Sequence, residues 1–509
     1  MKDFSVCSER HRSTVSRGCR LWERVIFAFF FVFSARLVFV YHYSAPSGFF
    51  GPALALFVAV FLAVFFFTKP SLAAFTASIP LGSGFYVTGL LPVNPLSFGF
   101  AVLFMGWAAK RVVRGETDFS PATGAGRVVD LLSTLVFISL IAALLKAEGP
   151  DVLHRVFFET GFSLTDPLFP LSAAFILLQG LFLFRIVELE ARPDEIHRWL
   201  VPVLLAQFVT VLFFASLQWW GHIPKLYKRM NVFSPFDDLH ALGSYLCFAA
   251  FFLADRCRTC QGGQRAAAAA LLAGTLLFLF LTRSRTAWAV LVLTVAFLVG
   301  WRLEPWKKNL FTAACLLSLL LVNLAGHHFL GSKVYSVRRY ASTWTLENYD
   351  RDRNVTSRAV LWRRAATMIV AHPLTGTGIG TYFRLSLEYH EPFLEKYSKF
   401  RQNTHNYFLQ LAAETGLPAL GACLAVIVLV LRSGLQLLKK EEWAGFPLKG
   451  LITGITAYLL TLVFGNALLL SSQQLFFWSV LAGVYVIGRG DGPGTVLGAG
   501  GPVGGVPGS

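Results

Sequence analysis

The fold is decided by apolar runs such as Phe27-Ala-Phe-Phe-Phe-Val-Phe33 and Phe61-Leu-Ala-Val-Phe-Phe-Phe67. Runs of this kind recur along almost all of the 509 residues, which are 55% hydrophobic and 14% charged, with a mean hydropathy of +0.59. A soluble domain carries about 25% charged residues, whereas a helix crosses a bilayer with about 20 mostly apolar residues. A transmembrane barrel would instead alternate polar and apolar residues over about 10 positions. The sequence therefore predicts an all-α, polytopic membrane protein.

The apolar runs and the breaks between them predict about fourteen membrane spans, close to the length that a bilayer requires. The expected spans are residues 25–43, 52–67, 71–91, 96–109, 128–146, 168–187, 199–219, 239–254, 266–282, 286–301, 309–325, 405–431, 447–470 and 475–488. Lys and Arg concentrate in alternate connections, which contain Lys110, Arg185, Arg256 and Arg432 among others. Because cytoplasmic connections carry the excess of basic residues, these connections and both termini are predicted to be cytoplasmic.

This orientation divides the chain into five segments. They are a basic cytoplasmic N-terminus (residues 1–24), transmembrane helices 1–11 (25–325), a long periplasmic loop with amphipathic helices (326–404), transmembrane helices 12–14 (405–488) and a Gly/Pro-rich cytoplasmic tail (489–509). Within the loop, Ser357–Ala371 has apolar residues at helical spacing, and His372-Pro373 is expected to end that helix. No small-residue cleavage site follows the first apolar run, so a first span is predicted and not a removed signal peptide.

The chain is strongly basic, with a formal net charge of +17 and a pI of about 9.7. No nucleic-acid-binding motif accompanies this charge, which cytoplasmic Lys and Arg and an anionic ligand would explain. The seven cysteines give no disulfide framework, and Cys257-Arg-Thr-Cys260 is an isolated CxxC, whereas structural zinc normally needs a second pair of ligands. We therefore expect no metal, no other cofactor and no nucleic-acid partner.

Two groups of arginines lie on the predicted outer side. Arg283 and Arg285 lie at the junction of the ninth and tenth spans, where arginine is costly enough to suggest a functional site. Arg358 and the pair Arg363 and Arg364 lie on the predicted loop helix. Snorkelling anchors are the alternative for the first group, and a solvated helix face is the alternative for the second. Guanidinium groups bind phosphate oxygens bidentately and stay protonated, so both groups suit a phosphate-bearing ligand.

His405 opens the predicted span 405–431 within Gln402-Asn-Thr-His-Asn406, again at the outer surface. A neutral imidazole accepts a proton from an attacking hydroxyl at neutral pH, and a purely structural hydrogen bond is the alternative role. Arginines and one histidine suit an alcohol that displaces a phosphate-type leaving group. They suit proteolysis or redox chemistry poorly.

Other signals are weaker. Gly376-Thr-Gly-Ile-Gly380 follows a helix and His-Pro, so it indicates a tight turn and not a dinucleotide-binding loop. Asp237-Asp238-Leu-His240 could ligate a metal, but capping of the helix that follows is favoured. Arg36 and Glu414 lie inside predicted spans and are expected to face the protein interior.

Four stretches of this sequence resemble the O-antigen ligase/polymerase superfamily, and the resemblance extends from about residue 230 to 430. They are Thr282-Arg-Ser-Arg-Thr-Ala-Trp288, Ser357-Arg-Ala-Val-Leu-Trp362, His372-Pro-Leu-Thr-Gly-Thr-Gly-Ile-Gly380 and Asn403-Thr-His-Asn-Tyr-Phe-Leu-Gln410, the last continuing to Glu414-Thr-Gly416. Ligases of the superfamily carry a His-Asn pair, nine residues and then Gly-x-x-Gly. Here Gly416 has the expected spacing, but Ala419 occupies the last position. This departure slightly weakens the interpretation as a ligase relative to that as a polymerase.

The resemblance implies a fold similar to the metal-independent C-type glycosyltransferases, with usually about twelve spans, so about 12–14 are expected here. It implies catalytic roles for His405, Arg285 and Arg358. We add a set of candidate residues for binding the diphosphate or ordering the loop, which are Arg283, Arg363, Arg364 and Asn406. The implied donor is an undecaprenyl-diphosphate-linked glycan.

The sequence thus predicts an O-antigen ligase of the bacterial inner membrane with its active site facing the periplasm. It would transfer the glycan to a lipid A–core sugar hydroxyl by an inverting mechanism, in lipopolysaccharide biosynthesis. The first alternative is an O-antigen or exopolysaccharide polymerase, which uses the same donor and a glycan acceptor. The second is a transporter of an anionic solute, although the repeated halves of many transporters are not visible here. Membrane lipids are the remaining expected partners.

Overall fold

The computed structural model describes residues 25–38 in part, 50–87, 95–116, 123–147, 155, 162–222, most of 232–282, 284–301, 304, 307, 353–389, 402–438 and 446–489. Every regular element in these ranges is a helix, and six of the helices are long and apolar enough to cross a membrane. The six are α4 (Pro95–Val113), α5 (Gly124–Leu144), α7 (Phe169–Glu190), α8 (Pro193–Trp219), α10 (Gly262–Thr282) and α17 (Leu417–Leu437). The predicted all-α, polytopic membrane fold is confirmed.

Shorter or more polar helices complete the described part. They are Val25–Arg36, α2 (Phe50–Phe66), α3 (Thr68–Val87), α9 (Leu239–Thr259), α11 (Arg285–Trp301), α14 (Arg353–Ala371), α15 (Tyr382–Leu385), α16 (Tyr407–Thr415), α18 (Leu448–Leu462), the 3₁₀ turn η5 (Ala467–Leu469) and α19 (Ser471–Arg489). The span predicted at 309–325 lies outside the described residues. The helix α14 ends directly before His372-Pro373, where the sequence indicated a stop.

The predicted span 405–431 is wrong as a single helix, because α16 and α17 are separate. The break is at Gly416, whose φ of +86° lies in the left-handed region, and a Cβ at this position would overlap the carbonyl group of Leu374. Pro418 follows at the start of α17. The spanning part therefore begins at Leu417, and His405 lies outside it. The predicted span 447–470 likewise divides into α18 and η5.

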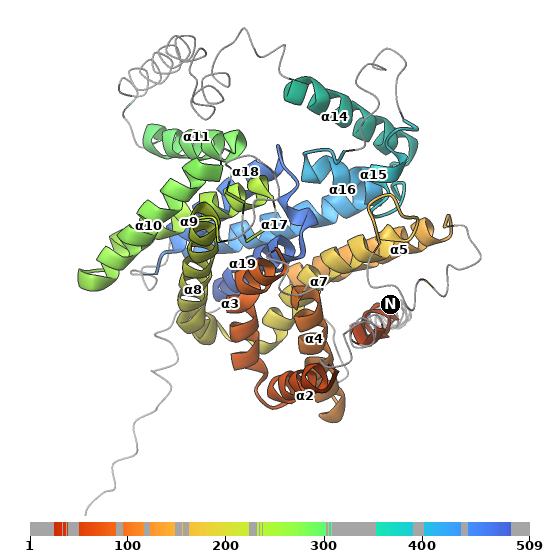
Figure 1. Ribbon diagram of the computed structural model, residues 1–509, viewed down its shortest axis with the longest axis horizontal. Coiled ribbons are helices and arrows are strands. Elements are labelled where there is room, and N and C mark those ends of the chain that lie inside the picture. Colours follow the sequence, from red (N-terminus) through yellow and green to blue (C-terminus); the bar gives the residue numbers. More distant parts are fainter. Residues whose placement is uncertain are drawn as a thin grey trace, which may run out of the picture.

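The centre of the bundle is α19, which contacts α7, α17, α8 and α3 (Figure 1). Its Trp478 packs against α7 so closely that a Cβ at Gly180 would overlap the indole ring. Polar side chains at its start are buried but bonded: Trp478 Nε1 donates to Gln474 Oε1 at 2.7 Å, and Gln474 Nε2 donates to Leu468 O at 2.6 Å. A helix buried all round suits the core of a large membrane bundle.

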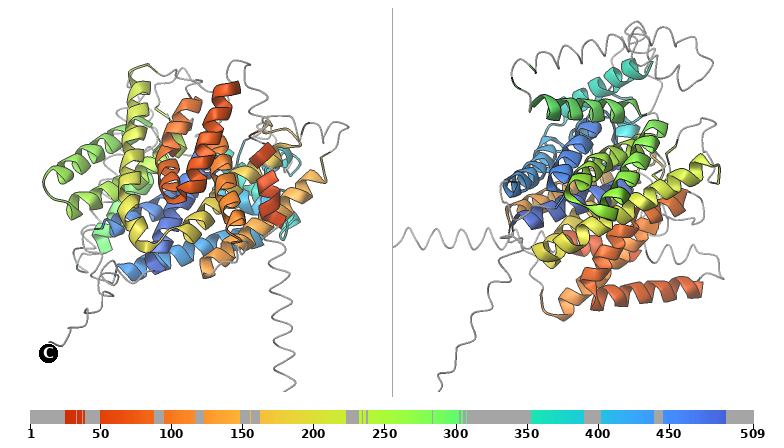
Figure 2. Two further views of the ribbon diagram at one scale, coloured as in Figure 1. Left: turned by 90° about the horizontal axis from the view of Figure 1, so that it is seen from below. Right: turned by 90° about the vertical axis from the view of Figure 1, so that its left-hand side faces the viewer.

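The helices α2 to α4 lie along one side of the molecule and α14 along the opposite side (Figure 1, and the right-hand view of Figure 2). Large apolar side chains remain exposed on the outer helices, including Leu56, Leu277 and Leu293. Contiguous apolar surface of this kind is unusual in a soluble monomer. It is what helices that contact lipid require.

Candidate active site around His405

His405 lies in a short non-helical segment, residues 402–406, that precedes α16. Its φ is +50°, which is uncommon for a residue with a side chain. The segment is held from two sides: Trp362 Nε1 of α14 donates to Thr404 O at 2.9 Å, and Tyr407 N donates to Gly465 O at 3.2 Å. Unusual backbone conformations persist where the surroundings fix them, and they often occur at functional sites.

A buried polar network supports the same segment from below. Asn466 Nδ2 donates to Gln410 Oε1 at 2.7 Å, and Thr404 Oγ1 donates to Asn406 O at 2.6 Å. Asn406, a predicted substrate-binding residue, is the N-cap of α16: its side-chain oxygen accepts the Leu409 N–H at 3.0 Å. Asn406 therefore positions the histidine segment, and a direct contact with substrate stays a prediction.

The structure explains the spacing of the family motif. The nine residues between Asn406 and Gly416 are α16 from its first residue to its last, so the spacing measures a helix between its N-cap and C-cap. Ala419, which departs from the motif, is fully buried in the first turn of α17. A small residue is needed there, and alanine meets this requirement almost as well as glycine.

Three other elements meet at His405. The ring of His240, in the first turn of α9, has its centroid 6.1 Å from that of His405. Ser284 Oγ lies 3.5 Å from His240 Nδ1, and the next residue, Arg285, begins α11. Arg358 of α14 is close enough to influence the charge of His405. We use the name outer site for His405, His240 and Arg358, together with Arg285, which adjoins Ser284 in the chain. These residues come from α9, α11, α14 and the segment before α16.

The outer site keeps His405 uncharged at neutral pH. Burial, which has the largest effect, the positive charge of Arg358 and the neighbouring His240 together lower its pKa to about 4. Asp238 acts in the opposite sense but more weakly. A neutral imidazole is the form that accepts a proton, so the geometry and the charge both suit a base.

The predicted arginines divide into different environments. Arg285 and Arg358 are half-buried at the outer site, whereas Arg363 is exposed on the same helix as Arg358. Arg364, also on α14, is buried, and it interacts electrostatically with Tyr382. Arg283 lies outside the described residues. The structure thus places Arg358 close to His405 and Arg285 next in the chain to Ser284, which lies beside His240, and it places Arg363 and Arg364 on other faces of α14.

The glycine-rich stretch does not form a nucleotide site but wraps the end of α16. Gly378 N donates to Glu414 O at 2.9 Å, and the Glu414 carboxylate accepts Gly380 N at 2.9 Å and Tyr382 N at 3.1 Å. A Cβ at Gly376 would overlap the Glu414 carbonyl group, which explains the glycine. The predictions of a tight turn and of an inward-facing Glu414 are confirmed.

His240 is the residue of the outer site that the sequence did not reveal. Its neighbour Asp238 caps α9, accepting Ala241 N at 2.7 Å, as the favoured interpretation of that stretch held. The available signal was position alone, since the predicted span places His240 at the same membrane face as His405. Among the described residues, no three His, Cys, Asp or Glu side chains lie close enough to hold a metal ion.

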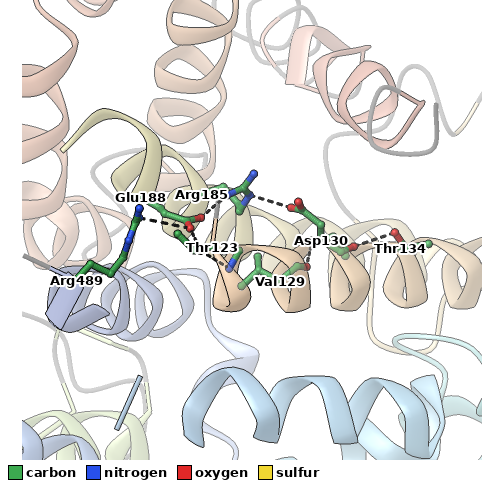
Figure 3. A network of polar contacts seen from close by, with 9 residues as sticks. Thr123, Val129, Asp130, Thr134, Arg185, Glu188 and Arg489 are labelled. Carbon is green, nitrogen blue, oxygen red and sulfur yellow. Dashed lines mark hydrogen bonds and ion pairs between the residues drawn. The ribbon is translucent and has the colours of Figure 1, made fainter. Parts of the chain in front are cut away.

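A second polar region, here called the inner network, joins α5, α7 and α19 (Figure 3). Arg185 was expected in a cytoplasmic connection, but it lies buried within α7, between Asp130 and Glu188. Its Nε donates to Asp130 Oδ1 at 2.9 Å, and its Nη1 binds Glu188. Thr123 also donates to Glu188, and Arg489 Nη1 lies 3.9 Å from Glu188 Oε1. The prediction that Arg185 lies in a connection is therefore wrong, because this residue lies within a helix and forms buried ion pairs.

Fold and site together define a multi-pass, α-helical membrane protein with a histidine and arginine site. Residues 268–424 match the family model described as O-antigen ligase. This range contains Arg285, Arg358 and His405, and it confirms the predicted resemblance to the O-antigen ligase/polymerase superfamily for this part of the chain. The match supports a glycosyltransferase-like activity of ligase or polymerase type, acting on a lipid-linked glycan and an acceptor. No curated protein matches the chain.

Proposed function

We propose that this protein is an O-antigen ligase that transfers a glycan from undecaprenyl diphosphate to a lipid A–core sugar hydroxyl at the periplasmic face of the bacterial inner membrane. The observation that carries the proposal is the position of His405 beside Arg358 and His240 within or next to the matched region. Arg285 follows Ser284, which lies 3.5 Å from His240 Nδ1, and we assign it to the same site on this basis. In this proposal the site supplies one proton acceptor and two positive charges.

The arginines bind the donor in this proposal. Arg285 and Arg358 contact the diphosphate oxygens, which guanidinium groups bind bidentately, and the lipid tail lies between neighbouring helices. As the bond between the anomeric carbon and the phosphate oxygen breaks, negative charge develops on the diphosphate. Positive groups fixed at this position stabilise that charge without having to reorganise. Arg283, two residues before Arg285, is a further candidate for this role.

His405 acts on the acceptor. Its neutral ring takes the proton of the sugar hydroxyl while that oxygen attacks the anomeric carbon on the face opposite the diphosphate, so the configuration inverts. A base with a pKa near 4 is weak, but the bound diphosphate offsets the charge of Arg358. The pKa of His405 then rises towards its ordinary value. The donor therefore makes His405 a stronger base as it binds.

A transfer experiment tests the chemistry. The purified protein receives an undecaprenyl-diphosphate glycan and lipid A–core, and the expected product is glycan-substituted lipid A–core with release of undecaprenyl diphosphate. Movement of an anionic solute across vesicles with no consumption of the lipid-linked donor would instead identify a transporter. The variant His405→Gln serves as the inactive control.

A deletion strain separates a ligase from a polymerase. The polymerase is the alternative that remains open because Ala419 departs from the ligase motif. A strain lacking a ligase accumulates polymerised, undecaprenyl-linked glycan, and its lipid A–core stays unsubstituted. Lipid A–core that carries a single repeat unit would show that transfer is intact and chain growth is missing. That result would replace the ligase proposal with a polymerase.

The face of the site is tested by thiol labelling, in a background whose native cysteines are replaced. Thr367→Cys, on the exposed face of α14, should react with a membrane-impermeant reagent added to intact spheroplasts. Gln261→Cys, between α9 and α10, should react only after lysis. The reverse pattern would contradict a periplasmic site.

A further inference from the structure

A cavity of about 600 Å³ opens between α8, α9 and α10, away from the outer site. It is lined by His197, Arg198, Val201, Pro202, Leu205, Arg256, Gln264, Ala267, Ala268, Leu271 and Phe446. About 24 Å of helix separates His240 at the start of α9 from Arg256 near its end, given a rise of ~1.5 Å per residue. The cavity is therefore distinct from the site around His405.

The polar part of the cavity is cationic. Arg198 of α8 and Arg256 of α9 line it, and the described lining residues include no carboxylate. Asp194, one turn earlier on α8, lies 3.9 Å from Arg198 Nη2 and is not part of the lining. Asp255, beside Arg256, accepts Gly450 N at 2.8 Å and is directed to α18. The charge of the lining thus favours an anion.

Gln264 is arranged to add a donor at the same place. Its Oε1 accepts from Arg256 Nη2 at 3.3 Å and lies 3.5 Å from Cys260 Sγ. With the oxygen held in this way, the amide nitrogen has two N–H groups for a ligand. His197, on the other wall, packs on Phe446 with ring centroids 5.1 Å apart. Two guanidinium groups and an amide are the donors that suit phosphate oxygens.

The rest of the cavity wall is apolar. The helices α8 and α10 approach each other at Leu212 and Gly274, where an added Cβ would lie 3.2 Å from the leucine. Nearer the arginines, the cavity lies between these two helices, and its wall there is formed by Val201, Leu205 and Leu271. Farther along α10, on the side away from the cavity, Leu277 and Phe280 are exposed, as expected for a helix that contacts lipid. A hydrocarbon chain fits this wall, and a free anion would leave it unfilled.

We propose that this cavity binds an anionic phospholipid, with the phosphate against Arg198, Arg256 and Gln264 and an acyl chain along Val201, Leu205 and Leu271. Basic pockets between membrane helices bind anionic headgroups in this way. Inorganic phosphate offers the same headgroup chemistry without the chain, so it distinguishes a lipid site from a free-anion site.

The test measures lipid binding to the full-length purified protein by native mass spectrometry and by the midpoint of thermal unfolding. Phosphatidylglycerol should bind and raise the midpoint, whereas phosphatidylcholine and inorganic phosphate at the same concentration should not. The double variant Arg198→Gln/Arg256→Gln should bind phosphatidylglycerol about 30-fold more weakly, since each basic residue at a membrane surface contributes about fivefold. The matched control Arg258→Gln/Arg265→Gln removes two exposed charges, one at the end of α9 and one at the start of α10, that do not line the cavity. This variant should bind phosphatidylglycerol as the wild type does.

A second variant tests the apolar wall without changing charge. Leu271→Trp should fill the chain-binding part and reduce phosphatidylglycerol binding, with Arg198 and Arg256 intact. Equal binding by the two double variants, or equal stabilisation by phosphatidylcholine, would overturn the proposal. Stabilisation by inorganic phosphate alone that Leu271→Trp leaves unchanged would also overturn it, in favour of a free-anion site.

Discussion

The outer site and the inner network use the same kinds of side chain in opposite ways. In the inner network, Arg185 lies between two carboxylates, Asp130 and Glu188, so buried charges neutralise one another. At the outer site, Arg358 and His240 both disfavour a charge on His405, and the carboxylate of Asp238 opposes them only weakly. In the first region carboxylates surround an arginine, and in the second mainly positive groups act on a neutral histidine.

The difference indicates what each region does. A buried ion pair is stable only if its charges compensate each other, and such compensation holds helices in register. The inner network connects α5, α7 and α19 in this way. Titratable groups whose pKa is strongly shifted, as that of His405 is, concentrate at functional sites. The outer site is where we propose that the donor binds, and the inner network connects helices of the bundle.

The largest effect is expected at His405. His405→Ala should reduce glycan transfer about 10²- to 10⁴-fold, which is the usual contribution of a general base, with membrane levels near those of the wild type. His222→Ala, an exposed histidine that follows α8, is the matched control and should be fully active. Transfer by His405→Ala at the wild-type rate would show that this histidine is not the base, and that the outer site does not differ from the inner network in having a catalytic role.

The inner network should respond in stability and not in chemistry. Arg185→Met removes the guanidinium group that pairs with half-buried Asp130 and buried Glu188, and it leaves Glu188 with Thr123 and the more distant Arg489, so the free energy of unfolding should fall by about 3–5 kcal/mol. Transfer per folded molecule should persist. Arg127→Met removes an exposed arginine from α5 and controls for the loss of charge. The measurement is the unfolding midpoint in detergent, and equal midpoints for the two variants would show that the network does not stabilise the bundle.

The sequence predicted most helices because a bilayer demands long apolar segments, which hydropathy detects directly. It missed the break at Gly416 because one span was drawn through Glu414-Thr-Gly-Leu-Pro418, where apolar residues continue farther along on both sides. Gly416 and Pro418 were local signals of a helix end and a helix start. It missed the pairing of His240 with His405, and the burial of Arg185, for a different reason. Arg185 binds Asp130 from 55 positions earlier in the chain, and contacts between such distant positions leave no local pattern.

The arginines of the outer site should depend on shape as well as charge. Arg358→Lys and Arg285→Lys should each reduce transfer about 10- to 100-fold, because an ammonium group cannot replace bidentate hydrogen bonds worth about 1.5–3 kcal/mol. Arg363→Lys, on the exposed face of the same helix as Arg358, should remain near wild-type activity. A fully active Arg285→Lys would indicate a simple membrane anchor. Equal losses at Arg358 and Arg363 would mean that helix α14 as a whole, and not one side chain, contacts the donor.

The smallest effect is a shift in pH dependence, and it directly tests the influence of Arg358 on His405. Protonation of His405 removes the base, so transfer should fall as the pH drops through its pKa. Burial, Arg358 and His240 lower that pKa to about 4 in the free protein, so kcat/KM should hold down to well below pH 6. Bound diphosphate offsets Arg358 and raises the pKa, so the acid limb of kcat should lie at a higher pH than that of kcat/KM.

Arg358→Gln removes one of the causes of the lowered pKa, and the residual transfer by this variant should therefore lose kcat/KM at a higher pH than the wild type does. Arg363→Gln changes an exposed charge on the same helix and should leave the acid limb where it is. The measurement is the initial rate of transfer at low donor concentration between about pH 4 and 8. If wild type and Arg358→Gln share one acid limb, then the positive charge of the outer site does not act on His405, and the base must be sought elsewhere.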